Sequence, residues 1–134
     1  IKEQLRSEGI FPPLVADVHF SADVALAVAR VADKVRINPG NFSKVHEDAC
    51  SKFLQLIDIC REEGTAIRIG LNHGSLGERI TSVYGNTPEA MKQAVMEWLR
   101  MGVAKDFKEV AVSLKASNTR VMARKASQRV MWLA

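Results

Sequence analysis

Three observations predict an α/β fold in which parallel strands alternate with helices. Short apolar stretches rich in valine and isoleucine recur along the chain, and segments with apolar residues at helical spacing separate them. Strand and helix alternate four times, as in sheets whose parallel strands are joined by right-handed crossovers. The composition, 47% hydrophobic and 25% charged, is that of one packed domain rather than a disordered chain.

Two βα units are predicted in the first half of the chain. A strand over residues 14–20 precedes a helix over residues 22–32, and the hydroxyl of Ser21 can cap the first N–H groups of that helix. A second strand over Lys34–Ile37 precedes a long helix over His46–Glu63. The glycine after this helix ends it, because glycine readily adopts the left-handed conformation of a helix C-terminus.

Two further units follow. A third strand over residues 66–71 precedes a helix over residues 88–101, which has Thr87 as its N-cap and a proline at its first position. A fourth strand over residues 109–114 precedes a helix over residues 118–133. Four βα units make about half of a closed eight-stranded (β/α)-barrel, which usually needs about 250 residues. An open four-stranded sheet is the alternative that the length alone allows.

The start of the chain and its cysteines indicate the type of protein. No initiator methionine is present, and the first residues resemble the end of an amphipathic helix, so we expect a fragment. No apolar run approaches the roughly 20 residues that cross a bilayer, so we expect no membrane partner. Cys50 and Cys60 lie ten residues apart in one predicted helix, which offers neither a disulfide framework nor a local metal motif and favours an intracellular protein.

The net charge of +4 suits either a nucleic acid or an acidic small molecule. The excess cations do not form runs, and no stacking aromatic residues accompany them. We therefore expect a small anionic ligand and no nucleic acid.

A polar face is shared by all four predicted strands. In the third, Arg68, Gly70 and Asn72 alternate with three apolar residues, so that one face of the strand is polar and the other apolar. Strands covered by helices on both faces normally have nearly continuous apolar runs, so the polar face is informative. The polar positions of the other strands are Asp17, His19, Arg36, Asn38, Ser113, Lys115 and Ser117.

If the apolar faces pack against helices, the polar faces line a barrel interior in which Arg36, Arg68 and Lys115 converge. Unpaired cations in so small a space are costly unless an anion neutralises them, because desolvating a charge costs several kcal/mol. Arginine offers a planar fork of donors for phosphate or carboxylate oxygens, and lysine a mobile charge. Asn72 adds an amide donor, and His19 adds a further donor or a proton.

Loops of small or polar residues, including residues 38–41 and 72–75, follow these strands, and their backbone N–H groups can approach an anion. The sequence therefore predicts a small molecule with anionic oxygens at the C-terminal ends of the strands. The alternative is an antiparallel sheet with one wet face, on which the basic residues are merely solvated. The helices between the strands disfavour that alternative.

Four sequence motifs, one on each predicted strand, carry a family resemblance. They occupy residues 13–20, 35–41, 67–76 and 113–117. In sequence and in order they closely resemble 4-hydroxy-3-methylbut-2-enyl diphosphate synthase, an enzyme of the non-mevalonate route of isoprenoid biosynthesis. One such motif would be a weak signal, whereas all of them in the family's order are highly specific.

The resemblance implies a TIM-barrel domain of which this chain supplies the third to sixth βα units. The family reductively opens and dehydrates 2-C-methyl-D-erythritol 2,4-cyclodiphosphate, using electrons from flavodoxin or ferredoxin that pass through a 4Fe-4S iron–sulfur cluster. The family positions that contact the substrate diphosphate match Arg36, Arg68, Asn72 and Lys115, with Asp17 and His19 nearby. These residues would bind and orient the diphosphate, and no residue is assigned a proton-transfer role.

The resemblance also sets limits. The family holds its cluster with three cysteines and a glutamate in a separate C-terminal domain, and nothing here matches that spacing. We therefore expect residues 1–134 to be a partial barrel that binds substrate, without metal ligands and inactive alone. The complete enzyme would be a homodimeric oxidoreductase in the bacterial cytoplasm or a plastid-type organelle. The alternative function is a non-catalytic phosphate-binding or assembly half-barrel.

Overall fold

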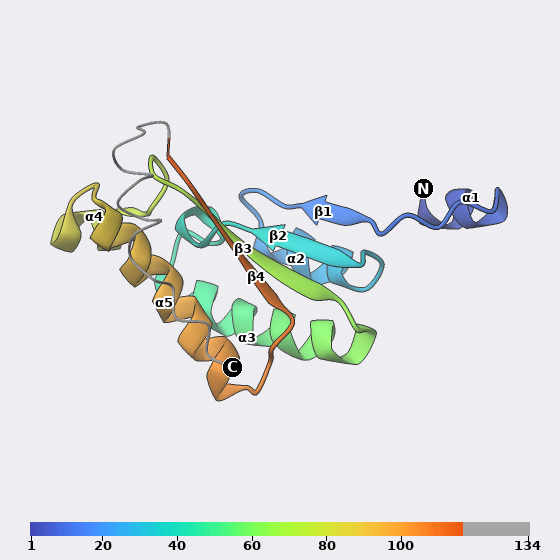
Figure 1. Cartoon of the computed structure of the whole chain (residues 1–134). Helices are drawn as coiled ribbons and strands as arrows, with labels where there is room; N and C mark the ends of the chain where they lie inside the picture. Colours follow the sequence, from blue (N-terminus) through green and yellow to red (C-terminus); the bar gives the residue numbers. More distant parts are fainter. Residues whose placement is uncertain (117–134) are drawn as a thin grey trace.

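The computed structural model describes residues 1–116. The predicted helix over residues 118–133 and the polar position Ser117 lie outside this part of the chain. The described residues form one sheet of four parallel strands in the order β1-β2-β3-β4 (Figure 1). The strands are β1 (Val15–Asp17), β2 (Lys34–Ile37), β3 (Ala66–Asn72) and β4 (Val110–Lys115). Parallel pairing of consecutive strands confirms the α/β prediction and contradicts the antiparallel alternative.

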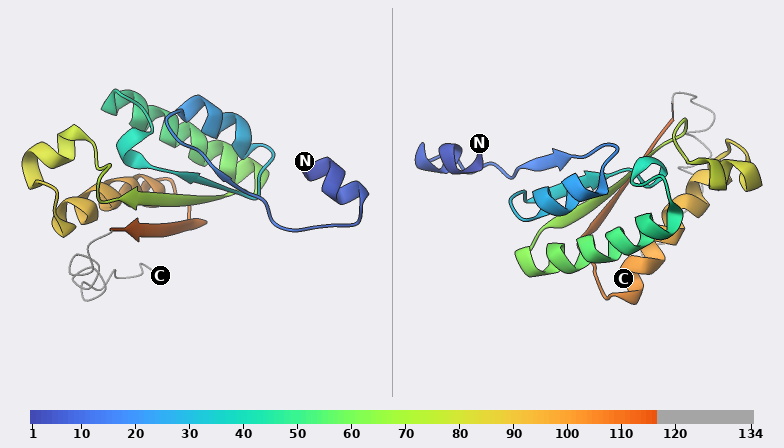
Figure 2. Two further views of the ribbon diagram at one scale, coloured as in Figure 1. Left: turned by 90° about the horizontal axis from the view of Figure 1, so that it is seen from above. Right: turned by 180° about the vertical axis from the view of Figure 1, so that it is seen from behind.

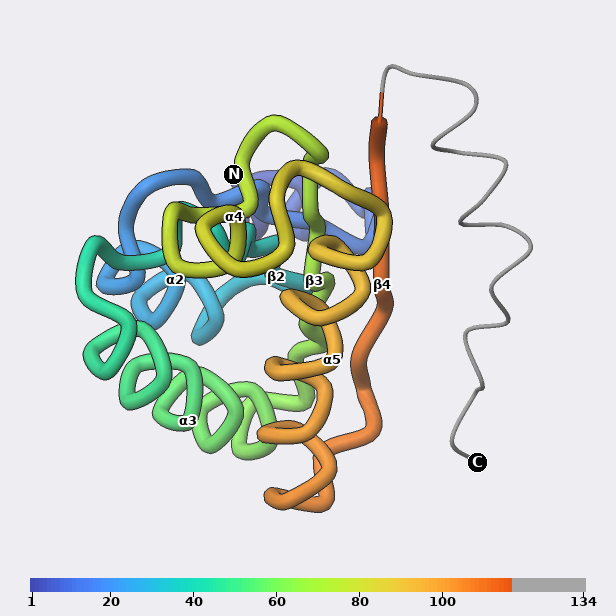
Figure 3. The backbone as a smooth tube through the Cα atoms, turned by 90° about the vertical axis from the view of Figure 1, so that its left-hand side faces the viewer, coloured from blue at the N-terminus to red at the C-terminus, as the bar shows by residue number. Residues whose placement is uncertain are grey.

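Helices cover one face of this sheet. In chain order, the helices of the described residues are α1 (Lys2–Ser7), α2 (Ala22–Ala29), the short 3-10 helix η1 (Pro39–Asn41), α3 (His46–Glu63), α4 (Glu78–Tyr84) and α5 (Pro88–Ala104), and α1 is not among those that cover the sheet. α2, α3 and α5 lie on the same side of the strands (Figure 2), and an end-on view shows them following one another around that side (Figure 3). α1 lies beyond the start of β1, apart from the other helices. No helix within residues 1–116 is long and apolar enough to cross a membrane.

Side-chain caps and glycine set the helix ends much as the sequence predicts. Ser21 Oγ accepts a hydrogen bond from Val24 N at 3.3 Å at the start of α2. Thr87 Oγ1 accepts one from Ala90 N at 3.2 Å at the start of α5. α3 ends at Gly64, which has φ 69°. α2 stops earlier and α5 runs later than predicted, and α4 was not predicted.

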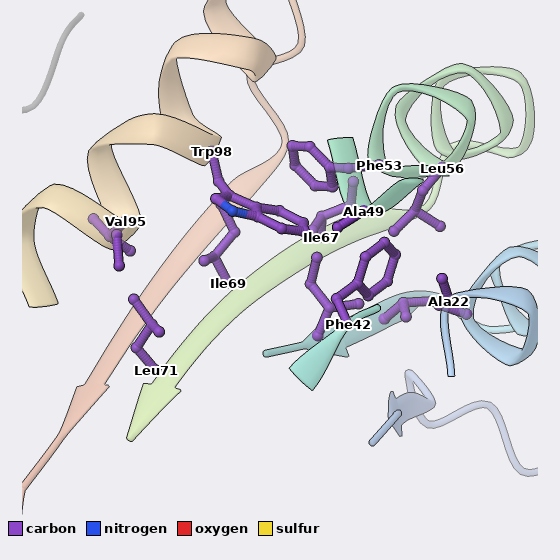
Figure 4. Close-up of a cluster of buried hydrophobic side chains, with 14 of the residues drawn as sticks. Ala22, Phe42, Ala49, Phe53, Leu56, Ile67, Ile69, Leu71, Val95 and Trp98 are labelled. Atoms are coloured by element: carbon purple, nitrogen blue, oxygen red, sulfur yellow. The ribbon is translucent and has the colours of Figure 1, made fainter. Parts of the chain in front are cut away.

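The apolar face of the strands and the helices enclose the core, as the alternation predicts. The ring centroids of Phe53 in α3 and Trp98 in α5 are 4.4 Å apart. Phe42 packs edge-on against the same indole (Figure 4). The apolar positions of β2 and β3, all fully buried, are Val35, Ile37, Ile67, Ile69 and Leu71. Burying each such side chain contributes roughly 1.5–3 kcal/mol. The alternate residues of the same strands point the other way and form the polar face.

The first strand is shorter than predicted. Residues 14–20 were expected to be extended, but β1 ends at Asp17, and its ladder closes with Val18 N donating to Arg36 O at 2.9 Å. Phe20 has φ 64° and is 79% exposed. The prediction of a strand that continues to Phe20 is therefore wrong, because the chain turns there before the start of α2.

Candidate functional site: the polar face of the sheet

Strand register aligns the polar positions across the sheet. Asp17 of β1 lies opposite Arg36 of β2, which in turn lies opposite Arg68 of β3. Nearer the carboxyl ends of the strands, Asn72 of β3 lies opposite Lys115 of β4. All five residues point away from the helix layer, because their neighbours in sequence fill the core.

Arg36 is the best-held cation of this face. Its side chain is only 8% exposed, and Nη1 donates to Asp17 Oδ1 at 2.8 Å and contacts His19 Nε2 at 2.7 Å. Nη2 donates to the carbonyl oxygen of Gly70 at 3.2 Å. The structure therefore brings together three of the predicted residues, Asp17, His19 and Arg36, around one guanidinium.

The charge of this cluster acts on Asp17. Desolvation alone would raise the pKa of the Asp17 carboxyl, but the hydrogen bond from Arg36 and the positive charges around it outweigh desolvation and lower the pKa. Those charges include Lys115, which stands on the far edge strand of the sheet. Asp17 is accordingly a carboxylate at neutral pH, and it neutralises Arg36.

Arg68 is placed differently from Arg36. It is exposed on β3, and within residues 1–116 no hydrogen bond or ion pair joins it to another side chain. Its position is also four residues before Asn72, which is roughly 13 Å along a strand. Arg68 therefore shares the face with the Asn72–Lys115 pair, but the two are set at different heights along the strands.

The loops at the strand ends support one another. Asn38, 1% exposed, donates from Nδ2 to Ser75 Oγ at 2.9 Å and accepts from Gly40 N at 3.1 Å. A Cβ on Gly40 would stand only 1.8 Å from the carbonyl oxygen of Ser75. The glycine of the loop over residues 38–41 thus serves close loop packing, a role that sequence reasoning missed because the partner is 35 positions away.

A separate cavity of about 490 Å³ opens on the helix side, between η1, the start of α3, α4 and α5. His46 Nε2 lies 3.1 Å from Glu97 Oε1, and Arg79 pairs with the same carboxylate. Glu97 therefore pairs with Arg79 and contacts His46 at this cavity, which Lys44 also lines. At the polar face, Arg68 and Lys115 have no carboxylate partner within residues 1–116.

The described residues do not fit an iron–sulfur cluster. Cluster ligation needs several thiolates close together. Cys60 is 1% exposed, and burial raises its pKa to about 12. Burial and the Glu97 charge also raise the pKa of Cys50, so both thiols resist forming the thiolate that ligates iron. In the part of the chain that the structure describes, no group of three or more His, Cys, Asp or Glu residues could hold a metal ion.

Comparison with known proteins shows which sequences this chain resembles. The family model described as "GcpE TIM-barrel domain" matches residues 1–131. A protein of Phocaeicola vulgatus named 4-hydroxy-3-methylbut-2-en-1-yl diphosphate synthase (flavodoxin) is 50% identical over 137 residues, covering 90% of this chain and 22% of the relative.

Two further relatives have the same name. Those of Bacteroides thetaiotaomicron and Chlamydia trachomatis are 48% and 42% identical and align with 88% and 91% of this chain. The chain spans less than a quarter of the length of these relatives, 22% and 23% respectively.

Proposed function

The chain belongs to the family of the GcpE TIM-barrel domain, and we propose that it binds and orients the cyclic diphosphate substrate of a 4-hydroxy-3-methylbut-2-en-1-yl diphosphate synthase. The observation that carries the proposal is the polar face, on which three adjacent parallel strands present Arg36, Arg68, Asn72 and Lys115. Ligands of parallel α/β sheets and barrels bind at the carboxyl ends of the strands, which is where Asn72 and Lys115 stand.

The residues of this face would act by binding and charge stabilisation. The exposed guanidinium of Arg68 offers a fork of donors to two phosphate oxygens, and Lys115 adds a positive charge that can follow the ligand. Asn72 can donate from its amide. Arg36 already donates to Asp17 and Gly70, so its positive charge and its remaining N–H groups have a fixed position. Oriented binding of this kind lowers the entropy cost of the reaction.

Reduction of the substrate requires electrons, which in this proposal come from a 4Fe-4S cluster whose ligands lie outside residues 1–116. The residues described here would contribute no redox step and no metal ligand. Residues 1–134 would therefore form a substrate-binding part of an oxidoreductase and be inactive alone. The complete enzyme would be a homodimer.

The names and sources of the relatives support two finer points. The names of the three relatives above all include flavodoxin, which favours flavodoxin over ferredoxin as electron donor. Those relatives are bacterial proteins, which favours a bacterial cytoplasm over a plastid-type organelle.

Titration calorimetry of the full-length protein tests the proposal. We expect binding of 2-C-methyl-D-erythritol 2,4-cyclodiphosphate that weakens when the salt concentration rises, because salt screens the charges of the polar face. The matched control ligand is the same polyol without its diphosphate, which should not bind. Absence of binding by the cyclic diphosphate would overturn the proposal.

A phosphate-binding or assembly half-barrel is the second candidate. It is favoured by the two edge strands of the sheet, on which Val15 and Val112 are 52% and 36% exposed. Such a module would bind inorganic diphosphate as tightly as the cyclic diphosphate, or would self-associate on sedimentation without binding either. Selective binding of the cyclic compound favours the enzyme.

A further inference from the structure

Gly70 has a position in β3 at which a side chain would collide with Arg36. A Cβ built on Gly70 would lie 2.3 Å from Arg36 Nε and 3.1 Å from both Cζ and Nη2. Real Cβ atoms do not approach other heavy atoms this closely, so the guanidinium would have to move. The space above Gly70 is therefore occupied by Arg36.

The backbone itself does not require glycine at this position. Gly70 is not among the glycines with positive φ, and it pairs in register with Ser113 of β4 in an ordinary parallel ladder. Glycine in a strand interior loses conformational entropy and contributes no packing. Close approach of another group is the usual reason for such a glycine, and here that group is the guanidinium of Arg36.

We propose that Gly70 is a positioning residue, which by lacking a side chain fixes Arg36 across β3 in the orientation that receives the diphosphate. This inference rests on the proposed function of the polar face. Arg36 is held on one side by Asp17 and His19 and on the other by the Gly70 carbonyl. These contacts come from β1, from the residues after β1 and from β3. Together they hold the guanidinium in one orientation. A preorganised donor loses less entropy on binding an anion than a mobile one does.

Gly70→Ala keeps the strand but fills the space. The added methyl group would push Arg36 Nε away from β3 and break the bond from Nη2 to the Gly70 carbonyl. We expect affinity for the cyclic diphosphate to fall at least about tenfold, which is about 1.4 kcal/mol. The matched control is Gly102→Ala in α5, where a Cβ would lie an ordinary 3.6 Å from the Phe107 carbonyl oxygen.

A double-mutant cycle in the full-length protein separates positioning from a general packing defect. If Gly70 acts through Arg36, Gly70→Ala should weaken binding in the wild-type background and have no further effect in an Arg36→Ala background. The melting temperature should fall with Gly70→Ala in the wild-type background and stay the same or rise in the Arg36→Ala background. Removing Arg36 also removes the atoms with which the methyl group collides, and alanine costs less conformational entropy than glycine in a strand. Calorimetry and thermal unfolding of the four proteins measure both.

Two results would overturn the proposal: affinity of Gly70→Ala equal to that of the wild type, or losses from Gly70→Ala and Arg36→Ala that add in full. A wild-type protein that fails to bind the cyclic diphosphate would instead overturn the proposed function, and the ligand-directed role of Gly70 with it. In that case the melting temperatures still decide whether Gly70 positions Arg36.

Discussion

Arg36 of β2 and Asp17 of β1 are register partners that also form an ion pair, with Nη1 of Arg36 donating to Oδ1 of Asp17 at 2.8 Å. The two side chains differ sharply in exposure, 8% for Arg36 and 61% for Asp17. A nearly buried cation therefore depends on a carboxylate that water reaches. This asymmetry makes the pair sensitive to pH and to changes at Asp17.

Asp17→Asn should destabilise the protein at neutral pH. The substitution leaves the Arg36 charge without its carboxylate, which for a fully buried pair costs about 3–5 kcal/mol. Because solvent screens the exposed Asp17, we expect a smaller loss of about 1 kcal/mol in the free energy of unfolding. Urea denaturation at pH 7 measures it.

The same pair predicts how this loss depends on pH. Arg36 lowers the pKa of Asp17 in the folded protein. The stability that the Asp17 carboxylate contributes is therefore complete above the pKa of the unfolded chain, near 3.9, and is lost as the pH falls through the pKa of the folded protein. The difference between wild type and Asp17→Asn should therefore shrink below about pH 4. Asp106→Asn is the control, because Asp106 is highly exposed and, within residues 1–116, pairs with an exposed lysine alone. A pH-independent difference would contradict the assignment.

Arg68→Ala should weaken ligand binding without unfolding the protein. Arg68 is exposed on the polar face, so its removal leaves no buried partner unsatisfied. We expect the affinity for the cyclic diphosphate to fall by the value of a charge-assisted contact, about 1.5–3 kcal/mol. Calorimetric titration measures this loss, and Arg100→Ala on the exposed side of α5 is the matched control. Unchanged affinity in Arg68→Ala would remove Arg68 from the site.

Sequence patterns predicted the parts of the fold that depend on periodicity. The alternation of Ile67, Arg68 and Ile69 correctly separated the core face of β3 from its polar face, because each strand residue points opposite to its neighbours. The length and type of α3 followed from its apolar spacing and from Gly64. Helix α4 escaped prediction because it is short and contributes only Ile80 to the core.

Contacts between distant segments were beyond the reach of the sequence. Gly70 and Arg36 are 34 positions apart, and nothing local to either residue indicates that one fills the space left by the other. The same holds for Gly40 and Ser75. Sequence reasoning placed the cations on one face. Only the structure shows that Arg36 is buried and hydrogen-bonded whereas Arg68 is exposed.

Phe53→Ala should be strongly destabilising. Phe53 is fully buried beside the Trp98 indole, and its truncation would leave a cavity in the core. Such substitutions cost about 3–5 kcal/mol in the free energy of unfolding. Phe11→Ala is the matched control, because Phe11 is 74% exposed and should change stability by less than about 0.5 kcal/mol. Equal effects in chemical denaturation would contradict the core described here.

Cys60 should make the protein lose stability in alkaline solution. Burial raises the pKa of the folded thiol to about 12, whereas the thiol of the unfolded chain ionises near 9. Between these values the unfolded state binds fewer protons than the folded state, so stability falls as pH rises, by up to about 1.4 kcal/mol per pH unit. Cys60→Ala should remove this alkaline loss of stability. The difference in the free energy of unfolding between the wild type and Cys60→Ala should therefore narrow from pH 8 to about pH 10.

Alkylation provides a second measurement on the same thiol. Iodoacetamide reacts with thiolates, so at about pH 9 the peptide that contains Cys60 should stay unmodified in the native protein and be labelled after unfolding in urea. Cys50, which is only partly buried, provides the internal comparison and should react sooner in the native state. Equal labelling rates for the two cysteines in the native protein would mean that Cys60 is accessible, and the burial of the α3 face against the sheet would have to be revised.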